Sequence, residues 1–321
     1  MWSQDVLGDG WEQQVIPLRP DHQGEAVATL VRRTSDERHR RAVLYVHGYV
    51  DYFFQTHLGD AWAAMGYDFY AVDLRAHGRS LLPNQLANDI RSLATYAEEL
   101  DAAARIIREE EGHEVLVVQG HSTGGLTTSL WADARRDRPE GPALDALVLN
   151  SPWLDLNRPW LDRVMTTRAV EVIGRVAPNT IVGQLDPYYG AWLQDPDGGG
   201  WSYDLSWKPA EGFGVRAGWL RAIRRGHAAV ARGLAITVPI LLCTSTRSGP
   251  ADRWHDALDS TDSVLSVDQT LERAHLLGAD VTVVQIGGGV HDLALSPEPA
   301  RSDYLEAVRA WTSNRLGPAR G

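Results

Sequence analysis

The chain has 321 residues, 44% hydrophobic and 23% charged, a composition typical of a soluble globular protein with a sizeable core. Its formal net charge of -11 argues against nucleic acid as a main partner, because phosphate binding depends on basic surfaces. The single cysteine, Cys243, excludes an internal disulfide, and neither a secretory signal nor a run of about 18 apolar residues is visible, so we expect a cytoplasmic protein without an integral membrane span.

Segments with strand and helix character alternate along the first 150 residues. Runs rich in β-branched and aromatic residues favour strands at 25–33, 42–46, 67–72, 115–118 and 146–149. Apolar residues at spacings of three and four favour helices at 58–65, at 89–110 and after the fourth strand through residue 136. This alternation predicts an α/β fold, with a mostly parallel sheet flanked by helices.

The alternation stops after Pro152 and resumes near residue 234. Between these points the sequence is irregular and rich in Trp and Tyr. Beyond them it continues with a strand at 238–243, a helix at 267–277, a strand at 281–286 and a terminal helix through 304–311. We therefore expect one core formed by residues 1–152 and 234–321, interrupted by an inserted cap of residues 153–233.

The run Gly120-His121-Ser122-Thr123-Gly124 lies between a strand-like segment and a helical pattern. Gly-x-Ser-x-Gly in this context is typical of a nucleophile elbow, a tight turn that holds a serine hydroxyl above the edge of the sheet. Side chains in place of the two glycines would clash with the neighbouring strand or helix. Ser122 is therefore predicted to be a catalytic nucleophile.

A serine hydroxyl is a weak nucleophile, so it needs a base, and the base needs an acid that orients it. His291 is the candidate base, because it lies in a Gly-rich loop directly after the last predicted strand. The acid should lie in the long aspartate-rich loop after the strand at 238–243. Asp262 is the preferred candidate there. The competing aspartates of this loop are Asp252, Asp256, Asp259 and Asp268, and Asp155 is a further alternative.

Attack on a carbonyl also requires two hydrogen-bond donors for the oxygen that becomes negatively charged. The backbone N–H of Thr123, directly after Ser122 and at a helix N-terminus, is one candidate donor. The backbone N–H of Tyr49 is the other, because Gly48 allows the loop after the strand at 42–46 to turn inward. Together these two groups are predicted to form an oxyanion hole.

Four motifs occur in the order found in the α/β-hydrolase superfamily: His47-Gly48-Tyr49, Asp73-Leu74-Arg75-Ala76-His77-Gly78-Arg79-Ser80, Gly120-His121-Ser122-Thr123-Gly124 and Gly289-Val290-His291-Asp292. Over nearly its whole length, and least over the cap, the chain resembles the serine aminopeptidase and monoacylglycerol lipase (lysophospholipase-like) branch. The resemblance implies a cap inserted after the sixth strand. It also implies that Asp73, Arg75, His77 and Ser80 hold a loop in place. The aspartate-rich loop at 244–267 departs from the shorter form of the family.

We expect a serine hydrolase that cleaves a carboxylic ester with an apolar acyl or aryl group, such as a monoacylglycerol or lysophospholipid, through an acyl-enzyme. The aromatic residues that we expect to contact this small-molecule substrate are Trp153, Tyr188, Trp207 and Trp219. The histidines show no spacing such as His-Glu-x-x-His, so we expect neither a metal nor another cofactor. An aminopeptidase or amidase, a thioesterase or C–C bond hydrolase, and a non-catalytic scaffold remain as alternatives, and the oligomeric state is not predicted.

Overall fold

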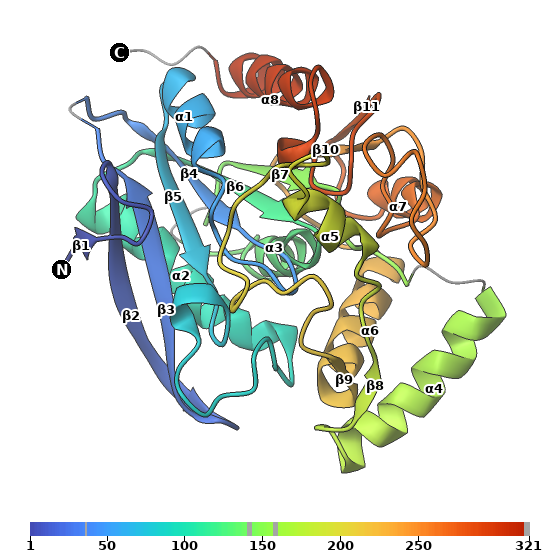
Figure 1. Ribbon diagram of the computed structural model, residues 1–321. Coiled ribbons are helices and arrows are strands. Elements are labelled where there is room, and N and C mark those ends of the chain that lie inside the picture. The colour runs from blue at the N-terminus through green and yellow to red at the C-terminus, as the bar shows by residue number, and fades with distance from the viewer. Residues whose placement is uncertain (36, 140–142, 157–159, 318–321) are drawn as a thin grey trace.

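A mixed sheet forms the centre of the protein in the computed structural model, which describes residues 1–35, 37–139, 143–156 and 160–317, without the side chains of 160–167. Within these residues the sheet has nine strands in the order β1-β2-β3-β5-β4-β6-β7-β10-β11 (Figure 1). Their bounds are β1 Ser3–Gln4, β2 Trp11–Asp21, β3 Gly24–Arg33, β4 Arg41–Val46, β5 Asp68–Asp73, β6 Val115–His121, β7 Ala146–Asn150, β10 Ile240–Ser245 and β11 Val281–Ile286. The strands from β5 to β11 in this order are parallel, and the three at the N-terminal edge are antiparallel.

Helices cover both faces of this sheet, as the sequence predicted. They are α1 Thr56–Ala64, α2 Ala97–Arg105, α3 Thr123–Ala134, α6 Ala217–Ala231, α7 Val267–Ala274 and α8 Ala300–Leu316. Side chains of α1 and α8 belong to the core on one face, and side chains of α2, α3, α6 and α7 belong to the core on the other. The prediction of an α/β fold with a mostly parallel, helix-flanked sheet is therefore confirmed.

Strand β4 shows how the sequence supplies both cores. Successive side chains of a strand point to opposite faces of the sheet. Accordingly, Leu44 and Val46 belong to one core, and Val43 and Tyr45 belong to the other. All four are buried, which explains why this central strand is a continuous apolar run rather than an alternating one. The apolar run ends at Val46, and the polar residue His47 follows it at the carboxyl end of the strand.

The described residues between β7 and β10 form a less regular group of elements beside the sheet (Figure 1). In order they make α4 Trp160–Val176, β8 Ile181–Gly183, α5 Tyr188–Gln194, β9 Val215–Arg216 and α6. Helix α6 is part of the main core through Trp219 and Ile223. Helix α4 packs closely on α6, since a Cβ at Gly174 would meet the Ala217 carbonyl oxygen at 2.5 Å.

Several elements differ from the sequence predictions, including β1 and also the helices α4, α5 and α6, which lie in a segment expected to be irregular. Strand β2 was not predicted, and it pairs with β3 in an antiparallel ladder at the edge of the sheet. The single helix predicted for 89–110 is three consecutive pieces, a 3-10 turn at Leu93–Tyr96, then α2, then a π-helical turn at Ile106–Glu110. None of the helices in the described ranges is long and apolar enough to span a membrane.

Candidate active site

Ser122 lies in a strained turn between β6 and α3. Its backbone φ of 52° and ψ of -117° are unusual for a residue with a side chain, and such strain persists only where the surrounding structure enforces it. The two flanking glycines enforce it here. A Cβ at Gly120 would collide with the Thr128 hydroxyl, and a Cβ at Gly124 would collide with the carbonyl oxygens at the end of β4. This close packing holds the Ser122 side chain at the carboxyl edge of the sheet.

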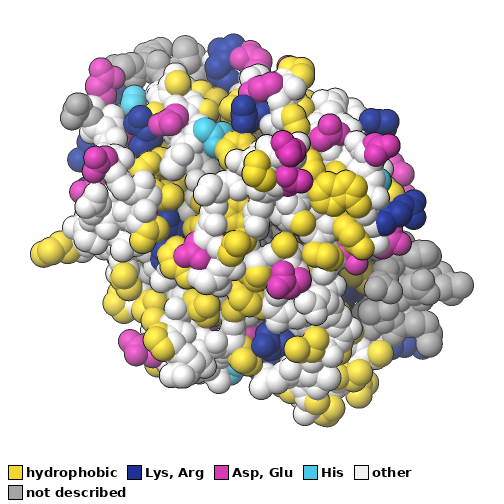
Figure 2. All heavy atoms as spheres, in the orientation of Figure 1, with side chains coloured by type: hydrophobic (Ala, Val, Ile, Leu, Met, Phe, Trp, Pro, Cys, Tyr) yellow, Lys and Arg dark blue, Asp and Glu magenta, His cyan; other side chains and the backbone are white. Residues whose placement is uncertain are grey.

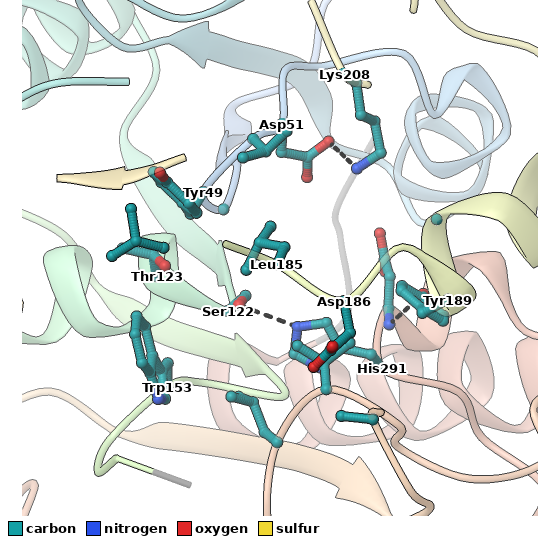
Figure 3. Close-up of a pocket in the computed structure, with 18 of the residues that line it drawn as sticks. Tyr49, Asp51, Ser122, Thr123, Trp153, Leu185, Asp186, Tyr189, Lys208 and His291 are labelled. Atoms are coloured by element: carbon teal, nitrogen blue, oxygen red, sulfur yellow. Dashed lines mark hydrogen bonds and ion pairs between the residues drawn. The ribbon is translucent and has the colours of Figure 1, made fainter. Parts of the chain in front are cut away.

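His291 lies within hydrogen-bonding distance of both Ser122 and Asp262, and Figure 3 shows its contact with Ser122. His291 follows β11, and its Nε2 is 3.0 Å from Ser122 Oγ. Its Nδ1 is 3.0 Å from Asp262 Oδ2. All three side chains are almost completely buried, with Ser122 as the most exposed residue at 9%. The structure thus brings together the three side chains that the sequence predicted as nucleophile, base and acid.

The Asp262 carboxylate is fixed by its own backbone neighbours. Its Oδ1 accepts hydrogen bonds from the N–H groups of Val264, at 2.9 Å, and Leu265, at 2.8 Å. Burial alone would raise the pKa of this carboxyl group, but the attraction of His291 and the hydrogen bonds that it receives hold the pKa below its usual value. Asp262 therefore remains an anion whose Oδ2 faces the imidazole.

The competing aspartates lie elsewhere. The four others of the same loop, Asp252, Asp256, Asp259 and Asp268, are exposed on the surface. Asp155 is partly buried near the start of the segment between β7 and β10, where its carboxylate forms ion pairs with Arg224, at 3.1 Å, and Arg273, at 2.8 Å. These ion pairs connect α6 and α7. Of the candidate aspartates, Asp262 is therefore the one hydrogen-bonded to His291.

The loop after β4 lies against the turn at Ser122. A Cβ at Gly48 would be only 3.1 Å from the Cβ of Ser122. Neither the backbone N–H of Tyr49 nor that of Thr123 has an acceptor among the described residues. His47 orients the loop, because its Nε2 accepts from the Leu74 N–H at 3.0 Å and its Nδ1 then donates to the Gly48 carbonyl oxygen at 2.8 Å. Fixing that carbonyl fixes the Tyr49 N–H of the same peptide unit.

A cavity of about 460 Å³ opens above Ser122. One part of its wall is apolar and includes Trp153, Leu156, Val215, Trp219, Leu220 and Leu265. Trp219 stacks on the ring of Tyr49, with centroids 3.9 Å apart. Of the four aromatic residues predicted to contact substrate, Trp153 and Trp219 line this cavity. Tyr188 and Trp207 are outside the described lining, where their chain neighbours Tyr189 and Lys208 stand instead.

Polar residues that the sequence interpretation did not select form another part of the wall. Lys208 pairs with Asp51 at 2.6 Å, and both side chains are largely buried. Tyr189 accepts a hydrogen bond from the Asp292 backbone N–H at 3.0 Å, and its ring meets that of His291 edge-on. The sequence offered one signal that could have drawn attention to this part of the wall: Lys208 is the only lysine in the chain.

The loop-fixing residues implied by the family resemblance form a dense network behind the site. Asp73 accepts hydrogen bonds from the Phe53 N–H at 2.9 Å and the Arg79 guanidinium at 2.8 Å. Arg75 forms a two-contact ion pair with the fully buried Glu99, at 2.8 and 3.0 Å. This network supports the loops that carry the site, at a distance from the cavity.

Comparison with known proteins places these features in a family. The sequence profile described as serine aminopeptidase, S33, matches residues 37–297. A monoacylglycerol lipase of Mycolicibacterium smegmatis is 27% identical over 288 residues, which are 88% of this chain and 91% of that protein.

Two solved structures show the same fold. A monoacylglycerol lipase of Paleococcus ferrophilus superposes with a TM-score of 0.60 at 20% identity, over 91% of this chain and 99% of that one. A soluble variant of the monoglyceride lipase of Saccharomyces cerevisiae, in complex with a substrate analogue, gives a TM-score of 0.65 at 13% identity, over 94% and 96% of the two chains. The likeness in both cases extends over almost the whole of each chain.

Proposed function

This chain belongs to the serine aminopeptidase S33 family and is a serine hydrolase of the α/β-hydrolase fold, and from that premise we propose that it hydrolyses carboxylic esters with an apolar acyl group. The observation that carries the proposal is the line of hydrogen-bonding contacts from Ser122 through His291 to Asp262 at 3.0 Å each. The apolar wall of the cavity supports an acyl chain or aryl ring as the group bound there.

In the proposed mechanism Ser122 Oγ attacks the ester carbonyl while His291 Nε2 accepts its proton. Asp262 keeps the other imidazole proton on Nδ1, so that Nε2 is free to act as a base. The backbone N–H groups of Tyr49 and Thr123 stabilise the oxyanion of the tetrahedral intermediate. His291 then gives its proton to the departing alcohol, leaving an acyl-enzyme. A water molecule, deprotonated by His291, releases the acid and restores the Ser122 hydroxyl.

We further propose that residues 153–233 act as a cap over this site. Support comes from the cavity, which residues of this segment and residues of the sheet loops line together. Tyr189 supports the same view, because it bonds to the loop that carries His291. Helix α6 would then be the part of the cap that is anchored in the main core.

The proposed substrate is a small-molecule ester, and its hydrolysis needs only water as a second reactant. On the face shown in Figure 2, Lys and Arg side chains are scattered among acidic ones, which does not suggest a phosphate-binding stripe there. A cytoplasmic location stays a prediction, which cell fractionation would check.

Hydrolysis of p-nitrophenyl esters tests the proposal. We expect Ser122→Ala to lower kcat by about a million-fold, the loss seen when such a nucleophile is removed. Ser263→Ala is the matched control, because Ser263 also lines the cavity but hydrogen-bonds to His255 and Thr261 instead of His291, and it should keep activity of the same order as the wild type. The wild-type protein should also react covalently with a fluorophosphonate.

A series of acyl chains tests the apolar acyl group separately. kcat/KM should rise from acetate to longer chains, because each buried methylene contributes about 0.8 kcal/mol. A flat or falling series would exclude the apolar acyl group. Faster turnover of aminoacyl-β-naphthylamides than of any ester would indicate an aminopeptidase instead.

A further inference from the structure

A buried asparagine, Asn150, connects the turn that carries Ser122 to the loop that carries His291. It is the last residue of β7, which lies beside β6 in the sheet, and it is 1% exposed. Its backbone carbonyl oxygen accepts the Ser122 N–H at 3.0 Å. Its side chain bonds to the other loop, because Nδ2 donates to Asp292 Oδ1 at 2.7 Å and Oδ1 accepts the Leu293 N–H at 3.2 Å. One residue thus joins the nucleophile turn to the two residues that follow His291.

Asp292 extends this connection to the loop between β4 and α1. Its Oδ2 accepts from Nε2 of Gln55, the last residue of that loop, at 3.2 Å. The Gln55 amide is itself fixed, because its Oε1 accepts the Phe54 N–H at 3.1 Å and its Nε2 also donates to the Tyr45 hydroxyl oxygen at 3.3 Å. The loop after β4, the nucleophile turn and the loop after β11 therefore meet at one buried carboxylate.

The hydrogen bonds to this carboxylate come from neutral groups. They are the amides of Asn150 and Gln55 and the backbone N–H of Ala294, which donates to Oδ1 at 3.0 Å. Burying a carboxylate against neutral donors costs free energy, and apolar replacements of buried charged groups are often neutral or stabilising. Stability alone therefore gives no reason for an aspartate at this position. Hydrogen bonds to a carboxylate are, however, shorter and about twice as strong as neutral ones, so they hold the joined loops more firmly.

The catalytic contact itself cannot hold these loops in place. His291 can take the Ser122 proton only while Nε2 stays near its distance of 3.0 Å from Oγ. That hydrogen bond is lost in every cycle, when Oγ becomes part of the acyl ester. The path through Asn150 persists, because it begins at the Ser122 backbone N–H and does not involve Oγ. A misplacement of about 1 Å at such a contact can lower the rate about 100-fold.

We propose that Asn150 is a positioning residue that fixes His291 relative to Ser122, and that Asp292 is the second positioning residue, through which Asn150 and Gln55 hold the histidine loop. The inference rests on the proposed roles of Ser122 and His291, and not on which ester is the substrate. Asn150 is not among the described residues that line the cavity. Its loss should therefore change kcat and leave KM unaltered.

Asn150→Leu tests the proposal, because leucine keeps the branched shape and removes both side-chain hydrogen bonds. The measurement is kcat for a p-nitrophenyl ester per active site, with the sites counted by complete reaction with a fluorophosphonate, so that unfolded protein does not contribute. We expect kcat per site to fall at least about tenfold, with KM within about twofold of the wild type. An unchanged kcat per site, or a loss that is confined to KM, would overturn the role of Asn150.

Gln119→Met is the matched control. Gln119 is a fully buried amide on the neighbouring strand β6, and it also makes two side-chain hydrogen bonds, from Trp62 Nε1 at 2.7 Å and to the Tyr304 hydroxyl at 2.9 Å. These bonds connect α1 and α8 and do not reach the histidine loop. The variant should lose stability in urea but keep kcat per site within about twofold. An equal loss of kcat per site in both variants would reduce Asn150 to an ordinary structural residue.

A pair of substitutions decides the question if Asn150→Leu does not fold. In Asp292→Asn the amide oxygen stays at the Oδ1 position, since Asn150 and Ala294 both donate there. The introduced NH2 group then faces the NH2 group of Gln55, and kcat per site should fall. Adding Gln55→Glu supplies an acceptor for that NH2 group, while its other oxygen still accepts the Phe54 N–H. The double variant should regain most of the lost kcat, and a double variant no faster than Asp292→Asn would overturn the proposal.

The rate of fluorophosphonate reaction separates this inference from ester hydrolysis. Attack of Ser122 on the probe needs His291 as the base but does not need the natural ester. A wild-type protein that is inactive on every ester, yet reacts with the probe at least about ten times faster than Asn150→Leu, would refute ester hydrolysis and support the positioning role. A wild-type protein that hydrolyses esters but reacts with the probe no faster than Asn150→Leu would overturn the positioning role alone.

Discussion

Asp262→Asn tests the proposed role of the acid most sharply. In the structure, Asp262 Oδ1 accepts from two backbone N–H groups, those of Val264 and Leu265, at 2.9 and 2.8 Å. An introduced amide must keep its oxygen at that position, because two donors already point at it. Its NH2 group then takes the place of Oδ2 and faces His291 Nδ1. The imidazole is forced to accept at Nδ1 and to carry its proton on Nε2, where it cannot take the proton of Ser122.

The expected loss follows from this reversed tautomer. The same substitution in a serine protease with this arrangement costs about 10⁴ in kcat, and we expect a loss of about 10³–10⁴ here. The assay is kcat/KM for a p-nitrophenyl ester at neutral pH, with circular dichroism to show that the variant is folded. Asp259→Asn and Asp268→Asn are controls that should keep activity within about twofold, since both side chains are exposed. If Asp262→Asn kept about a tenth of the wild-type activity, or if a control variant lost more activity than Asp262→Asn, the assignment of Asp262 would be wrong.

Two further predictions concern the scaffold behind the site. Arg75→Met leaves the buried Glu99 carboxylate without this ion pair and should lower the free energy of unfolding by about 3–5 kcal/mol. The double variant Arg75→Met/Glu99→Met should recover most of this loss. Urea denaturation measures both variants, and a double variant less stable than the single one would contradict the reasoning. Burial, with a contribution from His47, lowers the pKa of His77 to about 3, below the value of about 6.5 in the unfolded chain. The unfolded chain therefore binds a proton at His77 more readily than the folded protein does. The contribution of His77 to the free energy of unfolding is complete above pH ~6.5 and is lost as the pH falls toward 3. His77→Gln should therefore reduce the slope of stability against pH in this window by about 1.4 kcal/mol per pH unit, and an unchanged slope would exclude His77 as its source.

The sheet was predictable where its strands are buried on both faces. Strand β4 is a continuous apolar run, and its bounds differ from the predicted 42–46 by a single residue. Strand β2 was missed because it lies near the edge, carries Pro17 and Pro20, and alternates irregularly between buried and exposed residues. The helix predicted for 89–110 was divided because apolar spacing does not distinguish α-helical hydrogen bonding from the tighter and wider turns at its two ends.

The candidate site could be predicted as far as local sequence and strand order determine it. Ser122 and His291 each follow a strand of the same parallel sheet, so their approach at one edge is a consequence of topology. Asp262 could be preferred but not isolated, since its orientation depends on hydrogen bonds from Val264 and Leu265 within an irregular loop. The contact of Asp51 with Lys208 joins residues 157 positions apart, and no periodicity links them.

The two ends of the segment between β7 and β10 lie close together, so the length of this segment can vary without moving the strands. The Ser151 N–H, just after β7, donates to the Cys243 carbonyl oxygen of β10 at 2.8 Å, so the chain leaves and re-enters the sheet on adjacent strands. Lengthening a loop whose ends are already held together costs only about 0.6 kcal/mol per doubling. The segment between β7 and β10 can therefore change in length at a small cost in free energy. Substrate preference can then diverge while the sheet, and the loops that carry Ser122 and His291, keep their register.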